Sequence, residues 1–148
     1  MELINMNNTA SMFSSYLEFK KIEGFQIEEL RDARHSVIFR TNIVIKGQTV
    51  PLGIIIDNSQ YVMVRANIAT QAVSDDNAFA INNLLMRRNY QNKLLKYYLT
   101  PDASVILDVC IPYQKGHFSA ELVYTIMQMV VKEIQEQYKE FMNVIWAE

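Results

Sequence analysis

The residue types that carry acid–base or nucleophilic chemistry are few in this sequence and lie far apart. The two histidines, His35 and His117, fall in expected turns and have no second histidine nearby. Cys110 lies between two branched apolar residues in an expected strand, where a packing thiol is the simplest interpretation. A nucleophilic thiol needs a nearby base and a lowered pKa, and the pattern indicates neither. We therefore expect a non-enzymatic protein.

Acidic residues occur as adjacent pairs, Glu28-Glu29 and Asp75-Asp76. Neighbouring residues do not present both carboxylates to one point, so neither pair predicts a metal site or an acid–base pair. The Asp75-Asp76 pair precedes an expected helix, where it complements the positive end of the helix dipole. The sequence also has no phosphate-binding loop, dinucleotide fingerprint or paired-cysteine zinc motif. We expect no metal and no cofactor.

A basic, amide-rich stretch joins the end of this helix to the next expected strand and includes Arg87, Arg88 and Lys93. With Tyr90 and Tyr98 nearby, it could contact phosphates and stack on bases, as in a nucleic-acid-binding regulator. The alternative is a cationic helix end that complements the dipole. The formal net charge is −2, from 14 Lys and Arg against 16 Asp and Glu, which argues against a broadly basic nucleic-acid binder.

Length and composition indicate one globular domain over residues 1–148, with 50% hydrophobic and 20% charged residues. A single cysteine excludes an intrachain disulfide and favours a reducing compartment. Residues 1–5 lack the basic start of a signal peptide, and no apolar run approaches the ~18 residues of a membrane span. We therefore expect a cytoplasmic protein without a membrane partner.

Hydrophobic periodicity predicts an α+β fold with the order α-β-β-β-α-β-β-α. The expected helices cover residues 11–23, 75–88 and 120–146, with Ser74 and Ser119 as N-caps of the last two. The expected strands cover residues 37–46, 49–57, 61–68, 93–99 and 105–111, while residues 25–30 form either a short strand or irregular structure. Short turns join the strands, so we expect a five-stranded antiparallel sheet with helices against one main face.

The opposite face of this sheet is unusually apolar for a surface in contact with water. It carries large apolar side chains mixed with a few charges: Tyr61, Met63, Leu94, Tyr98 and Ile106, with Arg40, Arg65 and Lys96. Either a segment of the same chain covers this face, or a second chain binds there. The last helix offers a further apolar surface around Val123, Met127 and Val131.

The element order resembles the type III secretion chaperone-like fold, and the second half resembles the YbjN-like family of bacterial sensory-transduction regulators. The resemblance rests on the segment 80–85 with Asn89-Tyr90, the hairpin of residues 93–99 and 105–112, and the terminal helix from Phe118 to Trp146. It implies a homodimer with a non-enzymatic role. Our hypothesis is a chaperone-like or regulatory homodimer that binds a client protein segment through its apolar sheet and helix surfaces.

Overall fold

One antiparallel sheet forms the centre of the computed structural model, which describes residues 6–147. Its strand order is β1-β2-β3-β4-β6-β5. The strands are β1 (Gln26–Glu29), β2 (Val37–Ile45), β3 (Gln48–Ile56), β4 (Tyr61–Ala69), β5 (Lys96–Leu99) and β6 (Val105–Pro112). The helices are α1 (Asn8–Phe19), α2 (Ala78–Gln91) and α3 (Ala120–Ile145). Residues 1–5, on which the signal-peptide prediction depends, lie outside the described residues.

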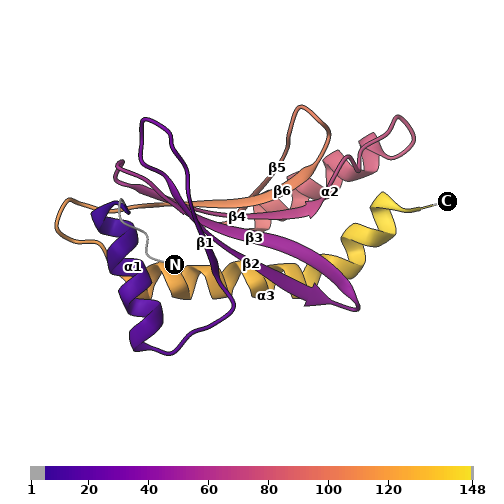
Figure 1. The fold of residues 1–148 in the computed structure, drawn as a ribbon. Coiled ribbons are helices and arrows are strands. Elements are labelled where there is room, and N and C mark those ends of the chain that lie inside the picture. The colour runs from indigo at the N-terminus through magenta and orange to yellow at the C-terminus, as the bar shows by residue number, and fades with distance from the viewer. Residues whose placement is uncertain (1–5, 148) are drawn as a thin grey trace.

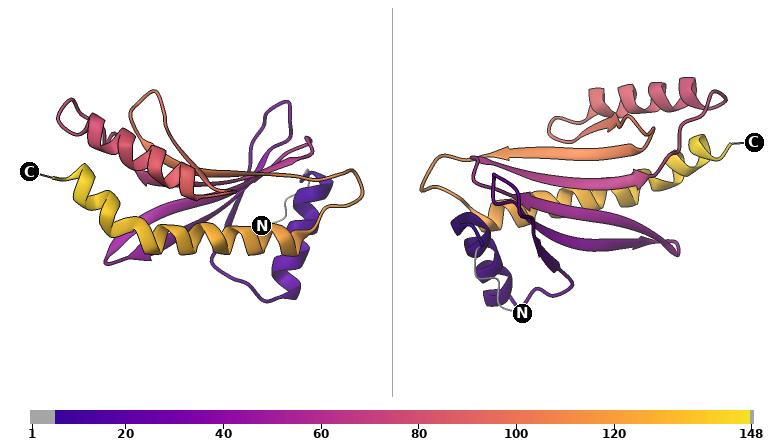
Figure 2. Two further views of the ribbon diagram at one scale, coloured as in Figure 1. Left: turned by 180° about the vertical axis from the view of Figure 1, so that it is seen from behind. Right: turned by 45° about the horizontal axis from the view of Figure 1, so that its top comes forward.

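Helix α3 runs along one face of the sheet, which we call the inner face (Figure 1). Helix α1 crosses near the start of α3, and α2 lies beside β5 and the last part of α3 (Figure 2). The core fills the space between the inner face and the helices, with Phe13, Phe39, Ile54 and Phe141 all but completely buried. All three helices therefore leave the opposite face of β2, β3 and β4 uncovered.

Period-two alternation sets which residues face the core. The even positions of β4 from Val62 to Ile68 are buried, as are the odd positions of β6 from Val105 to Ile111. The β2–β3 turn consists of Lys46 and Gly47, both at positive φ, which is the backbone shape that a two-residue hairpin with twisted strands requires. The predicted inner face of the sheet is therefore confirmed.

Several predicted elements need correction. The sheet has six strands rather than five, because residues 26–29 pair with β2 as an additional edge strand. The element order is consequently α-β-β-β-β-α-β-β-α. Ser74 is not the N-cap of α2, because the chain makes a turn in which the Asn77 side chain accepts a hydrogen bond from the Ser74 backbone N–H. Ser119 does cap α3, by accepting from the Leu122 backbone N–H.

The apolar start of α3 is not a free surface. Val123 and Met127 are buried and Val131 is partly buried, all in the main core, because the sheet and α1 cover this part of the helix. The predicted second burial surface on α3 is therefore wrong. Within residues 6–147, none of the helices is long and apolar enough to cross a bilayer.

Candidate binding site on the outer face of the sheet

The register places two rows of side chains across the sheet on the face opposite α3, which we call the outer face. The apolar row consists of Ile38, Ile55, Met63 and Cys110, which are successive cross-strand partners on β2, β3, β4 and β6. The central row consists of Arg40, Gly53, Arg65, Asp108 and Lys96, continued onto β5. Side chains in such rows are nearest neighbours, so each row acts as one surface.

Much of the apolar surface predicted for the outer face is open to solvent. Tyr61 is 57% exposed, Leu94 40% and Tyr98 38%, while Met63 is partly buried. Ile106 differs, because it is only 6% exposed between its cross-strand partners Asn67 and Tyr98. Leu94 lies just before β5 rather than in a strand, so the predicted start of that strand at residue 93 is wrong.

An ion pair anchors the middle of the central row. The Arg65 Nε and Nη2 donate to the Asp108 carboxylate, with Nη2 3.0 Å from Oδ2, and the Tyr98 hydroxyl donates to the same oxygen at 3.0 Å. The hydrogen bond from Arg65 to Asp108 raises the pKa of the guanidinium, so Arg65 stays charged. Burial and the charge of Asp108 raise the pKa of Tyr98, so its hydroxyl remains a donor at neutral pH.

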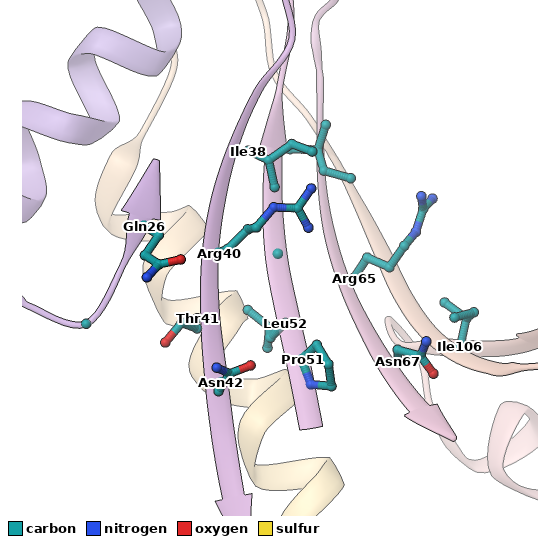
Figure 3. A pocket seen from close by; sticks show the side chains of 13 residues that line it. Gln26, Ile38, Arg40, Thr41, Asn42, Pro51, Leu52, Arg65, Asn67 and Ile106 are labelled. Carbon is teal, nitrogen blue, oxygen red and sulfur yellow. The ribbon is translucent and has the colours of Figure 1, made fainter. Parts of the chain in front are cut away.

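A groove of about 530 Å³ lies over this row and spans β1, β2, β3, β4 and β6. Figure 3 shows Arg40 on β2 and Arg65 on β4, on opposite sides of β3. Between them, β3 contributes Gly53, which has no side chain. Much of the remaining lining is a mixture of amides and aliphatic groups, which includes Gln26, Asn42, Asn67, Ile38, Ile55 and Ile106. A groove of this size and composition suits a short stretch of polypeptide or a small organic molecule with few charges.

The two other predicted cations of the outer face, Arg40 and Lys96, also have hydrogen-bond partners within the chain. Arg40 donates to the Glu28 carboxylate at 2.9 Å, and both side chains remain about half exposed. Lys96 Nζ donates to the backbone carbonyls of Asn89 and Asn92, at 2.9 and 2.7 Å. Lys96 therefore complements the C-terminal end of α2, where a cation is favourable, instead of facing the groove.

The basic stretch at the C-terminal end of α2 does not form a single cationic surface. Arg87 pairs with Glu140 of α3, and Arg88 pairs with the buried Glu133 of α3 at 2.8 Å. Both guanidinium groups are thus neutralised by carboxylates of the same chain. Lys93 lies beyond the end of α2, separate from these pairs.

The outer surface of α2 carries an apolar stripe that our sequence analysis missed. Phe79 is 80% exposed, Met86 70% and Tyr90 91%. Their spacing of seven and four residues places them on one side of the helix. The spacing of the three exposed residues is visible in the sequence. The sequence also contains a second apolar stripe, Ile81, Leu84 and Leu85, and this one forms the buried side of α2.

Among residues 6–147, histidine, cysteine and carboxylate side chains do not gather in any group of three that could hold a metal ion. Cys110 is exposed on the outer face, and burial by its neighbours, with the charge of Asp108, raises the pKa of its thiol. A raised pKa opposes formation of the thiolate, the form in which cysteine acts as a nucleophile. No family model matches this chain, and no curated protein matches its sequence.

Proposed function

We propose that this protein is a binding module that holds an extended segment of another protein on the outer face of its sheet, and that it works as a homodimer. The observation that carries the proposal is the open outer face, which has exposed apolar side chains at Tyr61, Leu94 and Tyr98 and a groove that crosses five strands. Aromatic side chains and arginines are enriched at protein interfaces. The same role is implied by the resemblance to the YbjN-like family and the secretion chaperone-like fold, and we place it in the cytoplasm.

Self-association is assigned to the α2 stripe of Phe79, Met86 and Tyr90. Three side chains of this size in each of two copies bury roughly 900 Å², which lies below the range of stable specific interfaces. We therefore expect a weak dimer whose population depends on concentration. This assignment leaves the outer face of both copies free for a partner.

The nucleic-acid hypothesis has less support, because Arg87 and Arg88 already pair with glutamates of α3. It predicts salt-sensitive retention on heparin, since phosphate contacts release counterions.

The outer-face proposal is tested with the double variant Tyr61→Glu/Leu94→Glu. Both side chains are exposed, so the fold should survive, which circular dichroism can check. The matched control is Phe19→Glu/Met129→Glu, which changes one exposed aromatic and one exposed aliphatic side chain on α1 and α3. We expect the wild type and the control to retain the same proteins from a lysate of the native organism, and the outer-face variant to lose them.

Light scattering over a range of concentrations tests the dimer. Phe79→Glu/Met86→Glu should be monomeric at concentrations where the wild type and the outer-face variant are dimeric. A wild type that stays monomeric would contradict the α2 assignment. Retention of an unchanged set of proteins by Tyr61→Glu/Leu94→Glu would contradict the role of the outer face.

A further inference from the structure

We propose that the groove selects a segment with an acidic residue, whose carboxylate lies above Gly53 and between Arg40 and Arg65. This inference rests on the proposed function and specifies the chemistry of the partner on the same face. The occupant is an extended segment of a polypeptide, bound across the strands.

The backbone geometry creates a recess between the two arginines. Arg40 and Arg65 are both cross-strand partners of Gly53, so their Cα atoms lie two strand spacings apart, about 10 Å. A Cβ atom on residue 53 would approach Ile38 Cγ2 to 3.3 Å, so a larger side chain would crowd Ile38 and fill the recess. A glycine in the middle of a strand often marks a bulge, a bend, or a place where a ligand or another backbone comes close. The Arg40 side chain reaches over β3 beside this recess, whereas the Arg65 guanidinium is held against Asp108 of β6 on the other side (Figure 3).

Both guanidinium groups keep donors for a ligand. Of the five N–H groups of Arg40, one is used on Glu28. Arg65 uses Nε and one Nη on Asp108, and its second Nη has no hydrogen-bond partner among residues 6–147. The side chains of Arg40 and Arg65 are 54% and 43% exposed, so a partner can reach them. Asp108 is mostly buried under Arg65 and Tyr98, so it holds Arg65 in place and presents little negative surface.

The only charged residues that line the groove are cations, although the chain as a whole is acidic. Among residues 6–147, the lining includes Arg40 and Arg65 and no carboxylate. With their partners Glu28 and Asp108 the local charges sum to zero, whereas the whole chain carries −2. An acidic segment is therefore repelled less at this groove than by the protein as a whole, which favours binding in one position.

The length of the groove sets the length of the segment. The five strands that line it span four strand spacings, about 19 Å, which an extended chain covers with about six residues. Ile38, Ile55 and Ile106 supply apolar contacts on either side of the arginines. We therefore expect about six bound residues with the acidic residue near the centre and small or apolar residues around it.

The test is a library of random displayed hexapeptides selected on the immobilised wild type, on Arg40→Gln and on Arg87→Gln. Arg87 is a matched control, because it is 51% exposed and pairs with one glutamate, much as Arg40 does. We expect the wild type and Arg87→Gln to enrich peptides with Asp or Glu at one fixed position. Arg40→Gln should lose this preference.

Fluorescence anisotropy with one selected peptide then measures the contribution of the carboxylate. Replacing its Glu by Gln should weaken binding to the wild type about tenfold, and should change binding to Arg40→Gln about twofold at most. Gly53→Val should weaken the binding of both the Glu and the Gln peptide, because its side chain fills the recess. Gly53→Ala adds only one methyl group and should weaken binding less. It replaces the valine variant in this test if the valine variant does not fold.

The outcomes separate this inference from the proposed function. Selected peptides without an acidic preference, or with the same preference on Arg40→Gln, would overturn the inference and leave peptide binding intact. Failure to enrich any peptide would overturn both. Competition by free glutarate at the concentration at which the peptide binds would also overturn the inference, because the site would then recognise a small carboxylate instead of a chain segment.

Discussion

Replacing Arg88 by methionine should destabilise the protein far more than the same change at Arg87. Arg88 donates through Nε and Nη2 to Glu133, whose side chain is only 8% exposed. Glu133 also accepts from the Tyr97 hydroxyl at 2.8 Å and from the Asn92 amide at 3.2 Å. These bonds connect α2 and β5 to α3, so they hold both proposed binding surfaces in position.

The magnitude follows from the burial of the two carboxylates. Arg88→Met leaves the Glu133 charge buried without a cation, which typically costs about 3–5 kcal/mol. Arg87→Met breaks an ion pair whose Glu140 side chain is 45% exposed, so water replaces the lost partner and the cost is about 1 kcal/mol or less. Urea unfolding followed by circular dichroism measures both values. Arg88→Met/Glu133→Gln should regain about 2 kcal/mol, because the buried charge is then removed.

A cost below about 1 kcal/mol for Arg88→Met would refute this reasoning, as would equal costs for the two arginines. Either result would mean that Glu133 reaches water once Arg88 is gone, and that the network does not fix α2 to α3.

Three further predictions concern Asn89 at the edge of the sheet, the buried Tyr97 and the thiol of Cys110. The Asn89 side chain accepts a hydrogen bond from the N–H of Tyr97 and donates one to its carbonyl, at the outer edge of β5. Asn89→Ala should therefore lower the free energy of unfolding in urea by about 1–3 kcal/mol and increase aggregation. The control Asn83→Ala, on the exposed side of α2, should have neither effect. Burial and the hydrogen bond to Glu133 raise the Tyr97 pKa far above the value of 10.0 of a free tyrosine. The contribution of this hydroxyl to stability is therefore complete below pH 10 and is lost as the pH rises further. In Tyr97→Phe, the free energy of unfolding should fall less steeply above pH 10 than in the wild type. Burial raises the pKa of Cys110, so its reaction rate with a thiol reagent should reach half of its maximum at a higher pH than that of a cysteine in an unfolded peptide.

Local patterns predicted the parts of the fold that depend on local physics. The alternation of Val62, Val64 and Ala66 with Met63 and Arg65 determines which side of β4 is buried, whatever the other strands do. The same pattern predicts the outer face and its apolar residues without reference to strand pairing.

The remaining features depend on contacts between distant residues. β1 has only four residues and a single apolar one, Ile27, and it exists as a strand because it pairs with β2. Helix α1 begins earlier than predicted because the Asn7 side chain caps it and also donates to the backbone carbonyls of His35 and Ile56. The recess at Gly53 requires the register of three strands.

The same limit applies to the charged residues. The sequence shows that Arg87 and Arg88 are adjacent, but only packing of α2 on α3 decides that one pairs with an exposed and the other with a buried carboxylate. The sequence pattern alone therefore suggested a cationic surface where the folded chain has two ion pairs.

The central claim, that another chain covers the outer face, is tested most directly by photo-crosslinking from Cys110. This residue is the only cysteine, is exposed, and lies opposite Met63 in the apolar row. A benzophenone maleimide on Cys110, irradiated in a lysate of the native organism, should give an adduct with one or a few specific proteins. The same label on Cys110→Ser/Gln128→Cys, on the exposed side of α3, should not give these adducts. Identical products from both positions, or products confined to the labelled chain, would contradict the account.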